Sequence, residues 1–314
     1  MENSGDRPIA IIGAGLVGMG WAIVFARAGR KVQVHDASAD LLADLPDRLE
    51  TALADLADHG LIGDPAPIAA RITIAGSLAE ALRGAVYVQE SILERVDVKR
   101  ALYAEMAPLL APDAHVGSSS SGIPSSEFTA GLSIAPRCLV AHPVNPPYLL
   151  SVVELVPAEW TLPEAVDSVH ALMQAVGQHP IRIARELRGF VLNRLQGVLP
   201  REAWALYEEG YCSLDDIDAT ISKGLGPRWA FMGPFETIDL NAPGGIADYA
   251  HRLGALYRDI AAERSEHAPW SADLIARADA ERRASLPLDK LADRCVWRDQ
   301  RLMAFAAHKK TQPE

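Results

Sequence analysis

The chain has 314 residues and a mass of 33.8 kDa, and 49% of its residues are apolar. This length and composition suit two folded domains with sizeable cores and exclude a disordered chain. The 30 basic and 41 acidic side chains give a formal net charge of −11, which disfavours nucleic acid and anionic membranes as partners.

The cysteines and the apolar segments indicate the compartment. Three cysteines, Cys138, Cys212 and Cys295, lie far apart in the sequence and form no motif that would bind a metal ion. Reduced thiols, a polar N-terminal segment without a signal-peptide pattern and the lack of a membrane-spanning apolar stretch predict a cytoplasmic protein.

The N-terminal segment has the pattern of a dinucleotide-binding strand–helix–strand unit. The apolar run Ile9–Ile12 leads into a G-x-G-x-x-G motif, and the run Val32–His35 is followed by Asp36. The motif comprises Gly13, Ala14, Gly15, Leu16, Val17 and Gly18. Its glycines allow a tight turn, a close approach of a pyrophosphate and a close helix–strand contact, and the helix N-terminus favours the phosphate charge. Asp36 would bind the ribose hydroxyls and repel a 2′-phosphate, which predicts NAD rather than NADP; a purely structural glycine turn is the alternative.

Strand and helix patterns alternate over the next part of the chain. The expected helices are Asp40–His59, Leu78–Leu82 and Val98–Leu110, and the expected strands are Ile72–Ile74, Val86–Val88 and His115–Val116. This alternation predicts an α/β fold with a Rossmann-type doubly wound sheet. Three more expected strands, some of them antiparallel, extend the sheet around a helix at Pro163–Val176: Cys138–Ala141, Val152–Val156 and Pro180–Ile183.

Strand patterns nearly vanish from Arg188 onward. The expected helices are Gly189–Glu209, Leu214–Ser222, Phe231–Leu240, Ile246–Ala262, Ser271–Arg283 and Asp289–His308. We therefore predict an NAD-binding domain over residues 1–188 and an all-helical domain over residues 189–314. The many apolar positions of these helices predict a homodimer.

Four polar features interrupt the apolar pattern between residues 117 and 193. They are the serine run Ser118–Ser121, His142 before a proline-rich turn, Glu154 inside an apolar strand, and Asn193 in the first long helix of the second domain. Each has a plain structural alternative: a capping loop, a core histidine, a carboxylate facing water and an exposed helical amide. Together they suit oxidation of an alcohol, because histidine titrates near neutral pH and removes the hydroxyl proton, a carboxylate orients it, and serine and asparagine bind the reacting oxygen.

Several long segments carry a family resemblance over nearly the whole chain. SSSSGIPSSEF, VAHPVNPPYLLSVVELVP, GFVLNRLQ and GLGPRWAFMGPFETIDLNAPGG, in this order, resemble the 3-hydroxyacyl-CoA dehydrogenase family, most of all the lambda-crystallin branch that includes L-gulonate 3-dehydrogenase. The resemblance implies an N-terminal dinucleotide-binding domain and a helical C-terminal domain that forms a dimer.

The resemblance also implies roles for particular residues. His142 is expected to be the catalytic base with Glu154 as its partner, and Asn193 and one serine are expected to contact the substrate oxygen. Ser121 is favoured because it precedes the histidine by the spacing that the family shows, and Ser120 is the alternative. Further cofactor contacts are expected at Glu94, Lys99 and Asn145; a surface Glu–Lys pair and a turn asparagine are the alternatives.

Two departures from the acyl-CoA-using members bear on the substrate. Residues 32–98 contain no lysine, and the acids of residues 40–64 would repel a CoA polyphosphate. Arg228, before a Met-Gly-Pro turn, has the geometry to bind a small carboxylate, although an exposed interhelical arginine is equally expected. The favoured function is NAD-dependent oxidation of the 3-hydroxyl of a small hydroxy acid, L-gulonate first. The alternatives are 3-hydroxybutyryl-CoA, carnitine (whose ammonium Trp229 could bind) and a non-catalytic, NAD-binding crystallin role.

Overall fold

The computed structural model describes residues 7–264 and 270–312 and divides into two compact units. Unit 1 comprises residues 1–196 and 295–314, and unit 2 comprises residues 197–294. The units part within the first long helix of the C-terminal half, whereas the predicted boundary after residue 188 lies just before this helix. That boundary stays a prediction.

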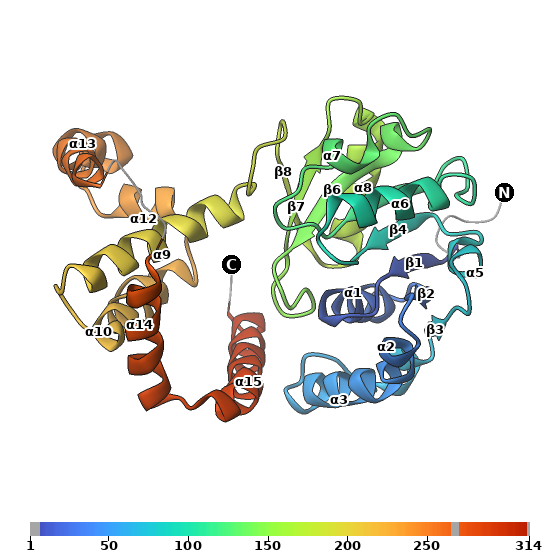
Figure 1. Ribbon diagram of the computed structural model, residues 1–314, viewed down its shortest axis with the longest axis horizontal. Helices are drawn as coiled ribbons and strands as arrows, with labels where there is room; N and C mark the ends of the chain where they lie inside the picture. The colour runs from blue at the N-terminus through green and yellow to red at the C-terminus, as the bar shows by residue number, and fades with distance from the viewer. Residues whose placement is uncertain (1–6, 265–269, 313–314) are drawn as a thin grey trace. The chain divides into compact units, whose positions relative to one another are not determined.

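Unit 1 is built on one mostly parallel sheet, as the sequence predicts (Figure 1). Within the described ranges its eight strands have the order β3-β2-β1-β4-β5-β6-β7-β8, and only the β6–β7 pair is antiparallel. The strands are β1 (Ile9–Ile12), β2 (Val32–His35), β3 (Ile72–Ile74), β4 (Tyr87–Glu90), β5 (His115–Ser118), β6 (Cys138–Pro143), β7 (Val152–Pro157) and β8 (His179–Arg182). The strand order reverses between β1 and β4, the position where doubly wound sheets bind dinucleotides.

Helices cover both faces of this sheet. They are α1 (Leu16–Arg27), α2 (Ala39–Ala43), α3 (Leu45–Asp58), α4 (Ala66–Ala69), α5 (Leu78–Leu82), α6 (Val96–Met106), α7 (Ser126–Thr129) and α8 (Pro163–Ala175). Because side chains alternate along a strand, Ile9 and Ile11 of β1 join a core with α1, α3 and α8, while Ala10 and Ile12 join a second core with α5, α6 and α7. Both faces are therefore buried, and polar side chains collect where the strands end.

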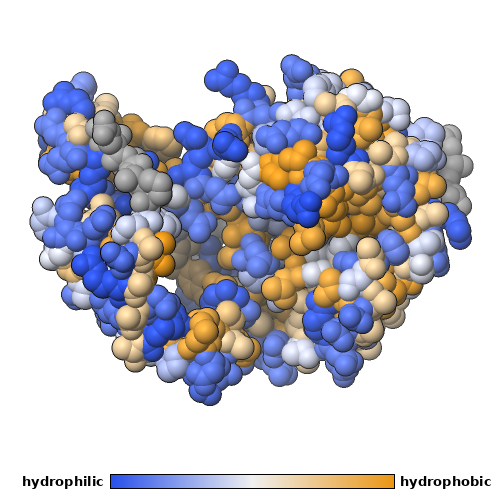
Figure 2. Space-filling model, in the orientation of Figure 1, coloured by the Kyte–Doolittle hydropathy of each residue, from blue (hydrophilic) through white to orange (hydrophobic). Residues whose placement is uncertain are grey.

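Unit 2 consists of helices in its described residues, as the sequence predicts. After α9 (Leu192–Glu208) come α10 (Leu214–Ala219), a π-helical segment (Thr220–Leu225), α11 (Gly226–Trp229), α12 (Pro234–Leu240), α13 (Gly245–Glu263) and α14 (Ala272–Ser285), and the unit ends within the first turn of α15 (Leu291–Lys310). Its small core contains Tyr207, Leu274 and Ala278, and the rings of Trp204 and Trp270 stack 4.8 Å apart. Figure 2 displays one face of the molecule, on which hydrophobic residues of this unit lie exposed among hydrophilic ones.

Two helices connect the units along the chain. The first turn of α9 belongs to unit 1, and α15 returns to it, where Met303 joins the core that contains α1. The predicted helix from Gly189 begins three residues later, because Gly189 and Phe190 have φ angles of 75° and 48°, which a right-handed helix does not accept. The three cysteines are free, and no helix in the described ranges has the length and apolar character that a membrane crossing requires.

Candidate active site

The glycine motif forms the turn between β1 and α1, and its three glycines have different surroundings. Gly13 has a φ of 109°, and a Cβ there would lie 2.4 Å from the Ser91 carbonyl oxygen. A Cβ at Gly18 would lie 1.8 Å from the carbonyl oxygen of Gly13. A Cβ at Gly15, in contrast, would have no atom within 4 Å. The first and third glycines are needed for backbone packing, and the second borders open space that a pyrophosphate can occupy.

Asp36 follows β2 and lies beside this turn. Its Oδ2 accepts a hydrogen bond of 2.7 Å from the Ala14 amide, and its Oδ1 accepts one of 2.8 Å from the Ser38 amide. Each oxygen keeps a lone pair for a ribose hydroxyl. The first turn of α1 has no side-chain cap, so its N–H groups can meet a phosphate. Turn, helix and carboxylate therefore fit a bound NAD.

His142 and Glu154 lie directly opposite each other in the antiparallel β6–β7 pair. The His142 Nδ1 and the Glu154 Oε2 are 2.8 Å apart, and both side chains are buried. The Glu154 Oε1 accepts two further hydrogen bonds of 2.8 Å from the amides of Val191 and Leu192, where α9 begins. The carboxylate thus engages one ring nitrogen of His142 and leaves Nε2 for a ligand.

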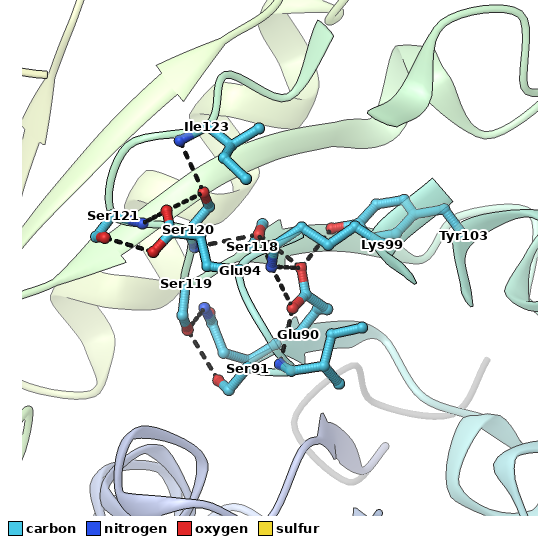
Figure 3. Close-up of polar contacts among 12 residues, drawn as sticks. Glu90, Ser91, Glu94, Lys99, Tyr103, Ser118, Ser119, Ser120, Ser121 and Ile123 are labelled. Carbon is cyan, nitrogen blue, oxygen red and sulfur yellow. Dashed lines mark hydrogen bonds and ion pairs between the residues drawn. The ribbon is translucent and has the colours of Figure 1, made fainter. Parts of the chain in front are cut away.

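The serine run wraps around the carboxylate of Glu94 (Figure 3). Ser120 Oγ and Ser121 Oγ donate to it at 2.9 and 2.6 Å, and the amides of Ser121 and Gly122 donate at 2.8 and 2.7 Å. Burial raises the pKa of Glu94, but these hydrogen bonds together outweigh it and hold the pKa below its usual value. Asn193 Nδ2 donates to the Ser121 carbonyl at 2.5 Å, which connects α9 to the serine run.

Lys99 and Glu90 form a buried ion pair behind the serine run (Figure 3). Lys99 Nζ lies 2.6 and 2.9 Å from the two carboxylate oxygens of Glu90, to which Ser118 Oγ also donates at 2.6 Å. Lys99 is 1% exposed and pairs with Glu90 rather than with Glu94. The expected contact between Lys99 and the cofactor therefore stays a prediction.

An open pocket of about 400 Å³ brings six of the sixteen predicted site residues together: Val17, Glu94, Ser121, His142, Asn145 and Asn193. It is lined by Val17, Ser91, Ile92, Glu94, Ser119, Ser121, His142, Pro143, Val144, Asn145, Leu192, Asn193 and Gln196. Ser120 is 2% exposed and is not among the lining residues. A larger hollow of about 610 Å³ beside α3, α4 and β3 contains no predicted site residue.

Arg228 lies outside unit 1. It belongs to α11 in unit 2, is exposed, and its Nη1 is 3.5 Å from Asn241 Oδ1. Its role toward a substrate stays a prediction.

Sequence reasoning missed several polar residues of the pocket. Ser91 and Gln196 line it, and the buried Gln89 and Trp21 hydrogen bond to Ser119, a member of the predicted serine run. Gln89 could have been found from the sequence, because a glutamine in the otherwise apolar beginning of β4 indicates a buried polar contact. Trp21 gave no signal, since an aromatic residue in an apolar helix is an ordinary core residue.

Comparisons with known proteins agree with this geometry. Residues 8–187 match the family model of the NAD-binding domain of 3-hydroxyacyl-CoA dehydrogenase, and residues 189–285 match that of its C-terminal domain. Lambda-crystallin of Oryctolagus cuniculus is 36% identical in an alignment of 320 positions that covers 100% of each chain. L-carnitine dehydrogenase of Pseudomonas putida is 36% identical over 245 residues, covering 78% of this chain and 75% of that protein.

Solved structures have the same fold. A 5-formyl-3-hydroxy-2-methylpyridine 4-carboxylic acid 5-dehydrogenase, described as an NAD+-dependent dismutase, superposes with a TM-score of 0.82 at 26% identity, covering 97% of this chain and 98% of that one. The 3-hydroxybutyryl-CoA dehydrogenase of Escherichia coli superposes with a TM-score of 0.66 at 30% identity, covering 75% of this chain and 49% of that one.

The fold, the glycine turn and these similarities define an NAD-dependent oxidoreductase that acts on a CH–OH group. The chain belongs to the 3-hydroxyacyl-CoA dehydrogenase family, and its full-length similarity to lambda-crystallins agrees with that branch.

Proposed function

We propose that this enzyme oxidises the 3-hydroxyl of a small hydroxy acid, with L-gulonate as the favoured substrate. The observation that carries the proposal is the buried His142–Glu154 pair, of which His142 lines a pocket together with Ser121 and Asn193. A base, its orienting carboxylate and two groups able to bind an oxygen are what alcohol oxidation requires.

In the proposed reaction, His142 Nε2 accepts the proton of the substrate hydroxyl. Glu154 stabilises the imidazolium that forms, because its carboxylate already lies 2.8 Å from Nδ1. NAD held by the glycine turn and Asp36 would supply the hydride acceptor for the carbinol carbon. Asn193 and Ser121 bind the reacting oxygen; the Ser121 hydroxyl, which donates to Glu94 in this structure, turns toward the substrate to do so.

The cofactor in this proposal is held by the glycine turn and its neighbours. With NAD bound, Asp36 would bind the adenosine ribose, the amides beside Gly15 would bind the pyrophosphate, and Glu94 and Asn145, which line the pocket, would contact the cofactor there. Lys99 supports this arrangement through its ion pair with Glu90. We place residues 1–188 in the NAD-binding domain and the enzyme in the cytoplasm.

Charge favours a free acid over an acyl-CoA thioester. The segment after β2 contains Asp40, Asp44, Asp47, Glu50, Asp55 and Asp58 and no lysine. Its Arg48 guanidinium donates to the Ala14 and Leu41 carbonyls instead of standing free for a phosphate. Carnitine oxidation is the second candidate, because an L-carnitine dehydrogenase is 36% identical and Trp229 is 38% exposed.

The test is NADH formation by the purified protein with L-gulonate, carnitine, 3-hydroxybutyrate and 3-hydroxybutyryl-CoA, each with NAD and with NADP. We expect turnover of L-gulonate with NAD, and a faster reaction than with the thioester. Preference for the thioester would contradict the proposal. His142→Gln provides the control, with an expected loss of roughly 10²- to 10⁴-fold in kcat and an unchanged NADH affinity.

The same panel tests whether Arg228 binds the substrate carboxylate. Arg228→Met is expected to raise KM for the preferred acid roughly tenfold to a hundredfold, the size of a lost charge-assisted hydrogen bond. Arg252→Met, at an exposed arginine of α13, is the matched control. An unchanged KM would remove Arg228 from the proposal.

A further inference from the structure

Two hydroxyls outside the expected catalytic set face each other in the pocket. Ser91 follows β4, Ser119 follows β5, and their Oγ atoms are 2.8 Å apart (Figure 3). The distance between the two oxygen atoms does not determine which hydroxyl donates the hydrogen bond. The direction of the bond is decided by what else each hydroxyl contacts.

The side chain of Gln89 has one possible orientation. It is fully buried on β4, and its Nε2 lies 3.2 Å from the Ala141 carbonyl oxygen and 2.8 Å from Ser119 Oγ. A backbone carbonyl only accepts hydrogen bonds, so the amide nitrogen has to face it. The remaining Oε1 accepts the hydroxyl of Tyr87 at 2.5 Å. Gln89 therefore donates to Ser119.

Ser119 Oγ also accepts a hydrogen bond from a second donor. Trp21 Nε1, which carries a hydrogen and can only donate, lies 3.1 Å from Ser119 Oγ. A hydroxyl oxygen has two lone pairs, and Gln89 and Trp21 fill both of them. The hydrogen of Ser119 is then the one shared with Ser91 Oγ. Ser119 donates and Ser91 accepts.

Ser91 is left with its own hydrogen to donate. Among residues 7–264 and 270–312, its hydroxyl has no hydrogen-bond partner besides Ser119. Its backbone lies against the glycine turn, since its amide donates to the Ile12 carbonyl at 2.7 Å and its carbonyl oxygen would be 2.4 Å from a Cβ at Gly13. It thus stands beside the β1–β4 junction, where the strand order reverses and a dinucleotide crosses the sheet.

We propose that Ser91 is an NAD-binding residue whose hydroxyl donates a hydrogen bond to an acceptor oxygen of the bound dinucleotide. Ser119, Gln89 and Trp21 are positioning residues that fix the direction of this bond. Ser119 cannot at the same time donate to a substrate oxygen, which leaves that role to Ser121. The inference rests on the proposed placement of the cofactor in this pocket and is independent of which hydroxy acid is oxidised.

The experiment measures NADH affinity by fluorescence titration without substrate, together with the Tm of each protein. Ser91→Ala is expected to weaken NADH binding roughly threefold to tenfold, the value of one hydrogen bond, with an unchanged Tm. Ser133→Ala, at an exposed serine beyond α7, is the matched control and should change neither quantity.

Ser119→Ala tests the positioning network. We expect its Tm to fall by several degrees, because the buried N–H groups of Trp21 and Gln89 lose their acceptor. In this background, Ser91→Ala should cost less NADH affinity than in the wild type, since the Ser91 hydroxyl is no longer held as a donor. An unchanged NADH affinity in Ser91→Ala, or equal losses in both backgrounds, would overturn the inference while leaving the substrate panel untouched.

Discussion

Glu154 accepts hydrogen bonds from three donors with two oxygens. One oxygen holds His142 Nδ1, and the other holds the amides of Val191 and Leu192. The residue therefore orients the proposed base and also binds the backbone amides at the beginning of α9. A carboxylate is the only side chain of this length that accepts on both sides.

We predict that Glu154→Gln reduces kcat by roughly 10²- to 10⁴-fold and stability by about 1–3 kcal/mol. An amide has one accepting oxygen, so its NH₂ group has to face either His142 or the two backbone donors. Steady-state kinetics and urea denaturation measure the two effects.

Glu164→Gln is the matched control for this change, because Glu164 is an exposed carboxylate in the first turn of α8. It should leave both kcat and stability unchanged. If Glu154→Gln kept the wild-type kcat, Glu154 would have no part in orienting the base.

At the scale of elements, α9 begins beside an unusual backbone conformation. Phe190 has a φ of 48°, in the left-handed region that disfavours residues with a Cβ, and follows Gly189 in the same region. Its ring is fully buried, packs with Val140, Val156 and Ile183, and has its centroid 5.7 Å from that of His142. The packing of the ring compensates for the backbone strain and places the amides that Glu154 binds.

Comparing Phe190→Ala with Phe190→Gly tests whether the packing of the Phe190 ring compensates for its backbone strain. Alanine removes the ring and keeps the strain, with an expected loss of about 3–5 kcal/mol in the free energy of unfolding. Glycine removes both, so its loss should be smaller than that of alanine by about 1 kcal/mol. Urea denaturation gives both values. An ordinary helix-start position would give the opposite order, with glycine worse than alanine, and would contradict the strain.

The elements themselves were largely predictable from the sequence. All eight strands lie where periodicity placed them, because a sheet buried on both faces requires continuous apolar runs between polar strand ends. Most long helices do so too, but the predicted single helix Asp40–His59 is divided at Asp44 into α2 and α3, since a new helix starts with Pro46 in its first turn. The beginning of α9 was wrong by three residues, because tertiary packing decides the conformation of Phe190.

The site was predictable only in part. Strand ends indicate which residues reach the same edge of the sheet, but side-chain partners depend on register and on packing. The His142–Glu154 contact requires the antiparallel register of β6 and β7, which no local pattern encodes. Lys99 shows that packing cannot be predicted from spacing either. Sequence spacing does not distinguish a lysine beside the pocket from one that is paired with the buried Glu90.

At the scale of the whole molecule, α13 is the feature that bears on assembly. This helix has 19 residues, and none of them is buried. Its apolar residues recur at helical spacing along one stripe, and four of them are at least 39% exposed: Ile246, Leu256, Tyr257 and Ile260. An exposed apolar stripe of this length is typical of a protein–protein interface, and closed homodimers are the commonest assembly.

We predict that a second copy of the chain covers this stripe. Sedimentation equilibrium should give a mass of about twice 33.8 kDa. Leu256→Arg places a charge within the stripe, where burial without a partner is costly, and should shift the mass toward that of one chain. Arg258→Ala, at an exposed position of the same helix, should leave the dimer intact. A wild-type mass of a single chain would contradict the dimer, and a dimeric Leu256→Arg would place its interface elsewhere.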